Sequence, residues 1–159
     1  TFNAMGLLSV SFNFRGVGKS QGSYKDGIGE RDDLAAVANF FRQRHPDAPI
    51  WLAGFSFGAF VAIHSWKQIE ADRLLLVAPP VSMFDFKSTE PVTIPWMVIQ
   101  GGRDEIIAPE QVSQWVGKQK PAADYQWMAE ADHFFHGRLN RIRETVMEQW
   151  RDVVPGEQA

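Results

Sequence analysis

Short apolar runs alternate with longer amphipathic segments along this chain, and the alternation constrains its fold more than any other feature. Five of the runs read as strands: Leu7–Phe14, Ile50–Phe55, Leu74–Ala78, Trp96–Gln100 and Tyr125–Ala129. Most of them are almost uninterrupted in apolar residues, which is typical of parallel strands covered on both faces. The sequence therefore predicts an α/β fold, with a mostly parallel sheet and helices on both of its faces.

The longer segments carry the periodicity of amphipathic helices. Apolar residues recur at i, i+3, i+4 and i+7 between Leu34 and Phe41, and Pro46 lies just beyond the pattern. Pro109 can begin a second helix, and a third runs through "RLNRIRETVMEQW". The chain of 159 residues shows no internal repeat or linker, so it is predicted to form one domain over residues 1–159.

The composition narrows the classes of function. A net charge of -3 gives no reason to expect nucleic acid or an anionic membrane as a partner. The chain has no cysteine, which excludes disulfides, thiolate zinc sites and cysteine nucleophiles, and fits a reducing, cytoplasmic compartment. No apolar run in the sequence has the length of a membrane span.

The stretch "FNFRGVGKSQG", residues 12–22, ends in a Gly-Lys-Ser that is typical of a nucleotide-binding P-loop. A P-loop would have a glycine where this chain has Asn13, and its helix would begin at the Gly-Lys-Ser. Further glycines follow instead, so the next helix is expected near Glu30. The stretch is better interpreted as a glycine-rich loop at the carboxyl end of a strand, with Lys19 as a solvated charge.

Residues 54–58, Gly-Phe-Ser-Phe-Gly, form the pattern G-x-S-x-G between a strand-like run and a helix. A serine on such a tight turn takes a strained backbone conformation, so its neighbours two positions away must be small, as Gly54 and Gly58 are. The turn would raise the Ser56 hydroxyl above the sheet and leave the N–H of Phe57 free to bind an oxyanion. The pattern favours Ser56 as a nucleophile, the alternative being that two glycines flank a serine by chance.

A serine nucleophile needs a base, and the chain has four histidines. His45 lies in a polar loop and His64 lies two turns into the helix that follows Ser56, so neither is well placed. His133 and His136 follow the last strand-like run, at the edge where open α/β sheets hold their sites. His133 is nearer the strand and is the predicted base, with His136 as the alternative. The two histidines have no evident third ligand, so no metal is predicted.

The base needs a carboxylate to orient it, and Asp104 is the first candidate. It follows a buried run and two glycines in "WMVIQGGRDEIIAP", a place from which it could hold one tautomer of an imidazole. A helix-capping role for Asp104 is one alternative, and Asp85, after the preceding strand-like run, is a second candidate for the acid. The order Ser56, Asp104, His133 is one in which such triads occur on α/β sheets.

These residues together resemble the α/β-hydrolase superfamily, over nearly the whole chain. The likeness is greatest to small, lidless bacterial serine hydrolases and esterases, which carry four motifs in this order: a glycine-rich loop, an elbow, an acid loop and a base segment. The matching segments here are Arg15–Ser20, Gly54–Gly58, Gly101–Asp104 and Ala131–Phe135. Only "PPVSMFDFKSTEPVTIP" stands where larger members insert a cap domain, so the resemblance implies an open site without a lid.

The resemblance also implies elements that this sequence lacks before Leu7. Members of the superfamily have three further strands and a helix there, and one of those strands lies between the run Leu7–Phe14 and the elbow strand. The loop after that strand normally donates the second oxyanion N–H. Because the sequence starts at Thr1, we expect an N-terminal truncation of a longer protein, poorly folded or nearly inactive when expressed alone.

The expected function is that of a serine hydrolase that cleaves carboxylic esters or related acyl compounds through an acyl-enzyme, without a cofactor. Ser56 would attack, His133 would shuttle the proton, Asp104 would orient His133, and the N–H of Phe57 would bind the oxyanion. The expected partner is a small acyl substrate, and thioesterase, peptidase and acyltransferase activities stay open because a fold does not fix its substrate. The alternatives are a non-catalytic binding protein with this fold and, with weaker support, a P-loop nucleotide-binding protein.

Overall fold

The structure is a computed structural model that describes residues 2–151, and the chain divides into two units. The larger unit spans residues 13–134 and contains a sheet and three helices. The other unit consists of residues 1–12 and 135–159, and its described part holds η1 (Phe2–Met5) and α4 (Leu139–Trp150). Every candidate site residue except His136 belongs to the larger unit.

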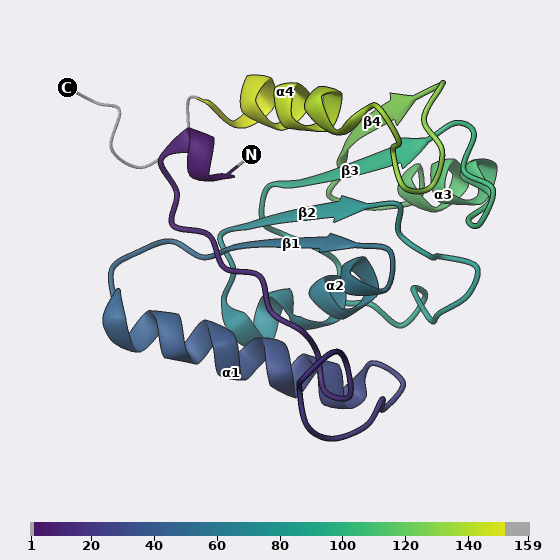
Figure 1. Ribbon diagram of the computed structural model, residues 1–159. Coiled ribbons are helices and arrows are strands. Elements are labelled where there is room, and N and C mark those ends of the chain that lie inside the picture. Colours follow the sequence, from purple (N-terminus) through teal and green to yellow (C-terminus); the bar gives the residue numbers. More distant parts are fainter. Residues whose placement is uncertain (1, 152–159) are drawn as a thin grey trace. The chain divides into compact units, whose positions relative to one another are not determined.

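Four parallel strands form the sheet, in the spatial order β1-β2-β3-β4 (Figure 1). Their bounds are β1 (Trp51–Phe55), β2 (Arg73–Val77), β3 (Trp96–Gly101) and β4 (Asp124–Met128). Each strand pairs in parallel with the next one along the chain. The predicted α/β class with a parallel sheet is therefore confirmed, and four of the five predicted strands lie within one residue of their expected bounds.

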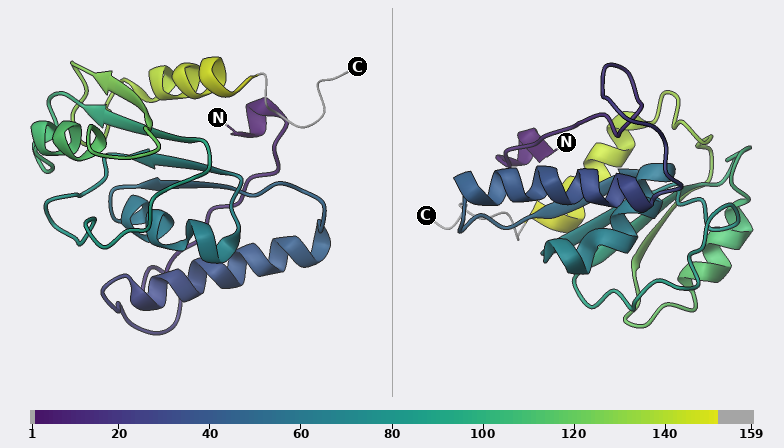
Figure 2. Two further views of the ribbon diagram at one scale, coloured as in Figure 1. Left: turned by 180° about the vertical axis from the view of Figure 1, so that it is seen from behind. Right: turned by 90° about the horizontal axis from the view of Figure 1, so that it is seen from below.

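Three helices build the core of the larger unit together with β1, β2 and β3. The helices are α1 (Ile28–Arg44), α2 (Phe57–Ile69) and α3 (Pro109–Val116). Helix α2 packs on β1 and β2, α1 packs on α2, and α3 packs on β3 (Figure 2). Buried members of this core include Ala38, Phe60, Ile63, Leu74, Leu76, Val98 and Val112.

The start of α1 is fixed by a buried carboxylate and a glycine. Glu30 accepts the backbone N–H groups of Lys25 and Gly27, both at 2.9 Å. Gly27 has a φ of 85°, and a Cβ at this position would overlap the ring of Phe60 on α2. Glycine therefore allows α1 to begin close against α2, and Glu30 satisfies N–H groups that the helix cannot.

The segment Leu7–Phe14 is not a strand, so this prediction was wrong. Backbone hydrogen bonds at its two ends are local: the N–H of Leu7 donates to Phe2, and the carbonyl of Phe14 accepts from Val17. Leu8 and Val10 are 71% and 53% exposed. Apolar composition favours a strand, but a strand exists only through a hydrogen-bonded neighbour, which composition cannot supply.

Residues 78–95 connect β2 to β3 and contain neither a helix nor a strand. This is the connection in which the sequence predicts that no cap domain is inserted. Within residues 2–151, no helix combines the length and the apolar character that crossing a membrane requires.

Candidate active site

Ser56 lies in the turn between β1 and α2, at the carboxyl end of β1. Its φ of 50° and ψ of -118° place a side-chain-bearing residue in a sparsely populated backbone region. The N–H of Ser56 donates to the carbonyl of Val77 at 2.9 Å, and its carbonyl accepts the N–H of Ala59 at 2.9 Å. The end of β2 and the first turn of α2 thus hold the strained turn that the G-x-S-x-G pattern predicts.

The two glycines of the turn have different surroundings. A Cβ on Gly54 would overlap the carbonyl of Gly58, so β1 and α2 can approach only because residue 54 is glycine. A Cβ on Gly58 would meet no described atom within 4 Å apart from its chain neighbours and the backbone of its own helix. The expectation that both residues must be small is therefore right for Gly54 and wrong for Gly58, because the Cβ direction at Gly58 points away from the atoms that crowd the turn.

Phe57 is the first residue of α2, so its N–H has no acceptor within the helix. The N-terminus of a helix also carries a partial positive charge, which favours a developing negative charge nearby. Its ring packs among aromatic rings, with centroids 5.9 Å from Phe14, 5.6 Å from Tyr24 and 5.5 Å from Phe84. These contacts fix the side chain while the backbone N–H stays available.

Asp104 and His133, which are 29 residues apart in sequence, form a buried hydrogen-bonded pair. The Nδ1 atom of His133 lies 2.8 Å from Oδ2 of Asp104, and the side chains are 3% and 0% exposed, respectively. The other oxygen, Oδ1, accepts the backbone N–H groups of Ile106 at 2.9 Å and Ile107 at 2.7 Å. An ionised carboxylate can only accept, so Nδ1 carries the proton and Nε2 is left as the basic nitrogen.

The acid loop, residues 101–107, lies directly against the base loop, residues 129–134. A Cβ on Gly101 would lie 2.5 Å from the carbonyl oxygen of Ala131, which is far inside van der Waals contact. The N–H of Gly102 donates to Met128 and that of Arg103 donates to Ala131, both at 2.9 Å. Glycine and these backbone bonds hold the two loops together, which brings Asp104 within reach of His133.

The elbow also reaches the base loop. The ring of Phe55, the residue before Ser56, lies 5.1 Å from the ring of His133 and 6.1 Å from that of Phe134. This contact forms although β1 and β4 are at opposite ends of the strand order. Among the described residues, no hydrogen bond joins the Ser56 hydroxyl to His133. Such bonds often tighten only when a substrate is bound.

Two polar residues beside the pair escaped sequence reasoning. The Nε2 group of Gln100, at the end of β3, donates to Oδ2 of Asp104 at 3.0 Å. The carboxylate of Glu105 accepts the backbone N–H of His133 at 3.2 Å. The available signal was a single polar side chain at the end of the apolar run "WMVIQ", four residues before the predicted acid.

The structure supports neither alternative to Asp104 as the orienting acid: Asp85 is engaged elsewhere, and Asp104 is not a helix cap. Asp85 accepts the backbone N–H groups of Lys87 at 2.9 Å and Ser88 at 3.1 Å, so its carboxylate closes a local turn. The N-cap residue of α3 is Ala108, so Asp104 does not cap that helix.

The other histidines lie elsewhere. His45 is exposed at the end of α1, and His136 is exposed in the smaller unit. Nδ1 of His64 lies 3.0 Å from the carbonyl of Phe60, and burial lowers the pKa of its imidazole, consistent with a structural role. In the part of the chain that the structure describes, no three His, Cys, Asp or Glu side chains are grouped as metal ligands.

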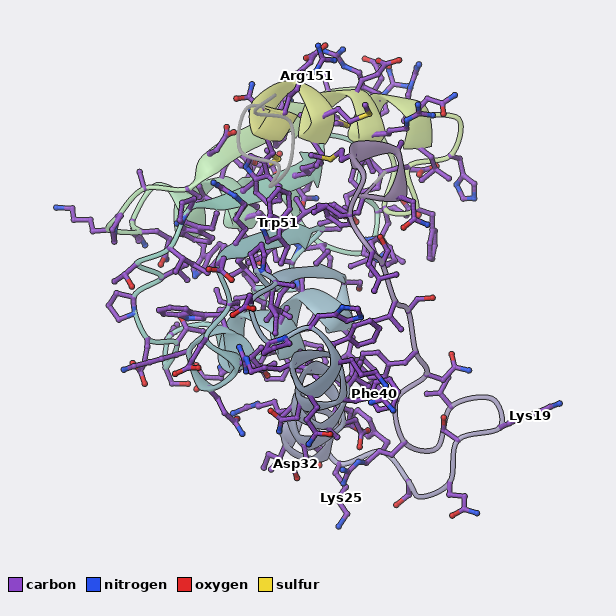
Figure 3. The ribbon with its side chains drawn as sticks, turned by 90° about the vertical axis from the view of Figure 1, so that its left-hand side faces the viewer. Lys19, Lys25, Asp32, Phe40, Trp51 and Arg151 are labelled. Carbon is purple, nitrogen blue, oxygen red and sulfur yellow. The ribbon has the colours of Figure 1, made fainter. Side chains whose placement is uncertain are left out.

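The glycine-rich loop, residues 15–22, is not arranged as a P-loop. Several of its backbone N–H groups already have partners in the protein: Gly16 donates to Gln21 at 3.1 Å, Ser20 donates to Val17 at 3.0 Å, and Arg15 donates to the Asp33 carboxylate at 2.8 Å. The following helix begins only at Ile28. Lys19 extends away from the tip of the loop (Figure 3). A P-loop presents these N–H groups and its lysine to phosphates, so the geometry does not support that alternative.

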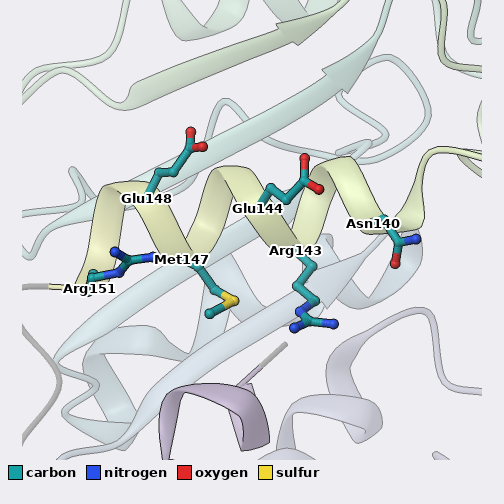
Figure 4. A pocket seen from close by; sticks show the side chains of 6 residues that line it. All are labelled: Asn140, Arg143, Glu144, Met147, Glu148 and Arg151. Carbon is teal, nitrogen blue, oxygen red and sulfur yellow. The ribbon is translucent and has the colours of Figure 1, made fainter.

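A hollow along α4 contains no predicted site residue (Figure 4). The side chains that line it are Asn140, Arg143, Glu144, Met147, Glu148 and Arg151. All six come from one helical stretch, and the charged ones are of both signs, as on an ordinary solvated helix surface.

Known proteins resemble this chain over most of its length. The sequence model of a family described as "Alpha/beta hydrolase domain" matches residues 2–155. An uncharacterized protein of Rickettsia prowazekii (strain Madrid E) is 32% identical over 151 residues, which cover 89% of this chain and 63% of that protein.

Two solved bacterial structures are similar in both sequence and fold. A serine hydrolase of the α/β type without a lid, from Xanthomonas campestris, is 40% identical with a TM-score of 0.86, covering 91% of this chain and 66% of that one. An α/β serine hydrolase homologue from Coxiella burnetii is 42% identical with a TM-score of 0.82, covering 86% of this chain and 66% of that one. The chain thus spans slightly less than two thirds of the length of these relatives.

Proposed function

This chain belongs to the α/β-hydrolase domain family, and we propose that the protein is a serine hydrolase that cleaves carboxylic esters or related acyl compounds. The observation that carries the proposal is the buried hydrogen bond of 2.8 Å between Asp104 and His133. The ring of His133 lies beside Phe55, the neighbour of the strained residue Ser56. A base oriented by a carboxylate, next to a strained and half-buried serine turn, is the arrangement that activates a hydroxyl nucleophile.

The proposed reaction has two halves. The Ser56 hydroxyl gives its proton to Nε2 of His133 as its oxygen attacks the carbonyl carbon of the ester, and the N–H of Phe57 donates to the oxyanion that forms. Collapse of this intermediate expels the alcohol, which takes the proton from His133, and leaves an acyl group on Ser56. Water then repeats the sequence and releases the acid, with Asp104 holding the Nδ1 proton throughout.

The proposal extends to the partner and the compartment. The partner is a small acyl compound, and the reaction needs only water as a co-reactant, so no metal or organic cofactor is part of the proposal. A cytoplasmic location belongs to the same proposal and is supported by the absence of cysteine from the sequence.

Ester hydrolysis by the full-length protein tests this proposal. With p-nitrophenyl acetate and butyrate as substrates, Ser56→Ala should lower kcat/KM by about 10³-fold or more. The matched control is Ser65→Ala, because Ser65 lies on α2, the helix that follows Ser56, and its hydroxyl donates to the Val61 carbonyl of that helix at 2.8 Å. Ester hydrolysis by Ser56→Ala at the wild-type rate would contradict the proposal. Failure of the wild type to hydrolyse either ester would contradict it too.

A further inference from the structure

Gln100 is a polar residue in a strand that is otherwise apolar until its final glycine. Every residue of β3 is buried, and the side chain of Gln100 is itself fully buried. A buried amide loses its hydrogen bonds to water and must recover them from the protein. Its position therefore raises the question of what the amide contributes that an apolar side chain would not.

The partners of Gln100 fix the orientation of its amide. Its NH₂ group donates to the carbonyl of Gly101 at 3.2 Å and to Oδ2 of Asp104 at 3.0 Å. Both partners are acceptors, so the reversed amide would place its oxygen against two other oxygens. In this orientation Oε1 is buried without a hydrogen-bond partner among the described residues. An unsatisfied buried carbonyl is unfavourable, and a methionine of similar length would avoid it.

The donor group of Gln100 acts on the oxygen that holds the base. Oδ2 of Asp104 accepts from both Gln100 and His133, while Oδ1 is held by two backbone N–H groups. Without the amide, only His133 would hold Oδ2, and the two backbone bonds to Oδ1 alone would restrain the carboxylate whenever the bond to His133 weakens. The amide therefore keeps Oδ2 directed at Nδ1 of His133 while a proton moves at the opposite nitrogen.

We propose that Gln100 is a positioning residue for the acid–base pair, which it serves by holding Oδ2 of Asp104 in line with His133. The catalytic part of this inference rests on the function proposed above. The geometric part, that Gln100 fixes the hydrogen bond between Asp104 and His133, does not depend on any activity.

Gln100→Met tests the proposal because it keeps the length of the side chain and removes its donor. The matched control is Gln126→Met: Nε2 of Gln126 donates to Oδ1 of Asp124 at 2.6 Å on the neighbouring strand β4, and among the described residues neither has a hydrogen bond to Asp104 or His133. In the full-length protein, Gln100→Met should lower kcat about 10- to 100-fold and change KM by less than about 2-fold. Gln126→Met should change neither parameter by more than about 2-fold.

A second measurement separates this inference from the proposed function. In ¹⁵N-histidine-labelled full-length protein, NMR should show the Nδ1 proton of His133 as a protected downfield resonance. It should broaden or move upfield in Gln100→Met and stay unchanged in Gln126→Met, with circular dichroism confirming that both variants are folded. An unchanged resonance in folded Gln100→Met would overturn the positioning role. A change in the resonance without any Ser56-dependent activity would instead overturn the proposed function and leave the geometric inference standing.

Discussion

Two loops of this protein have similar sequences and different structures. The glycine-rich loop, "RGVGKSQG", and the start of the acid loop, "GGRDE", both combine glycine with charged residues. In the first, the backbone N–H groups of Gly16 and Ser20 donate to carbonyls of the loop itself, and Lys19 is exposed. In the second, backbone donors reach the base loop and Asp104 is buried against His133.

The comparison shows what separates a site from a turn. Glycine and charge together mark a place where the chain bends sharply, and both loops satisfy that description. Only the acid loop buries a charged side chain. Asp104 is satisfied by the loop's own N–H groups at Ile106 and Ile107 and by donors from two other segments, Gln100 and His133. Buried polar groups that satisfy one another across segments are therefore the stronger indicator of a functional site.

The largest effect is expected in the acid loop. In the wild type, the Asp104 carboxylate accepts hydrogen bonds from His133 and its other donors. Asp104→Asn replaces one of its oxygens by an NH₂ group, which cannot accept the Nδ1 proton of His133. The preferred imidazole tautomer is then lost, and kcat should fall about 10³- to 10⁴-fold. The comparable change Asp85→Asn affects only a local turn and should leave kcat within about 2-fold. Steady-state kinetics of both variants check the prediction, and equal losses in the two would remove the distinction between these carboxylates.

A smaller effect is expected where the two loops touch. Gly101→Ala places a methyl group 2.5 Å from the Ala131 carbonyl oxygen, so it should cost about 1–3 kcal/mol in the free energy of unfolding and lower kcat about 10²-fold. In the glycine-rich loop, a Cβ on Gly18 would lie 2.9 Å from the end of the Asn13 side chain, which can move aside. The φ of Gly18 is 60°, so Gly18→Ala also strains the backbone. Gly18→Ala should lower the free energy of unfolding by about 1–2 kcal/mol and leave kcat unchanged. Denaturant titrations and kinetics measure both, and a large loss of activity in Gly18→Ala would show that this loop also belongs to the site.

A modest, pH-dependent effect is expected at the base of the glycine-rich loop. Arg15 donates to both oxygens of Asp33 in a partly exposed pair, and this hydrogen bonding holds the pKa of Asp33 below its usual range. A carboxyl group with a lowered folded-state pKa stabilises the protein at pH values above its unfolded pKa of about 3.9, and that stability is lost as pH falls through the folded value. Asp33→Asn should therefore lower Tm by a few degrees at pH 7 and by progressively less below pH 4. Thermal melts from pH 7 to pH 2.5 test this, and a difference that does not vary with pH would contradict it.

The smallest effect is expected at the tip of that loop. Lys19 is exposed, so Lys19→Ala should change the free energy of unfolding by no more than about 0.5 kcal/mol and leave ester hydrolysis intact. Mg-ATP should not alter Tm in either form. An increase in Tm with Mg-ATP that is lost in Lys19→Ala would restore the P-loop interpretation. The glycine-rich loop would then be a binding site and not an ordinary turn.

Much of the fold was predictable because parallel strands leave a strong pattern. The runs at Leu74–Ala78 and Trp96–Gln100 are buried on both faces, which requires nearly continuous apolar sequence, whereas Ala53 and Phe55 of β1 are exposed. The same pattern predicted a strand at Leu7–Phe14, where the structure has none. Composition reports the suitability of a segment for a sheet, whereas pairing depends on a neighbouring strand that the segment itself does not encode.

The candidate site was predictable for residues that follow neighbouring strands of the sheet, because such residues lie close together. Asp104 and His133 follow adjacent parallel strands, whose carboxyl ends meet at one edge, so their pairing could be expected. Gln100 could not be assigned in this way, because a polar residue at the end of an apolar run also marks an ordinary strand end. The freedom of Gly58 was equally inaccessible, since the direction of a Cβ depends on a turn geometry that only coordinates provide.

The most direct test of the central claim is covalent labelling of the full-length protein with a fluorophosphonate, followed by mapping of the modified peptide by mass spectrometry. The proposed hydrolase predicts a single phosphonylated residue, Ser56, no labelling of Ser56→Ala, and labelling of His133→Gln that is slower by about 10³-fold or more. A protein of this fold that binds ligands without catalysis would show no adduct at Ser56. That result, or an adduct on another residue that persists in Ser56→Ala, would contradict the account.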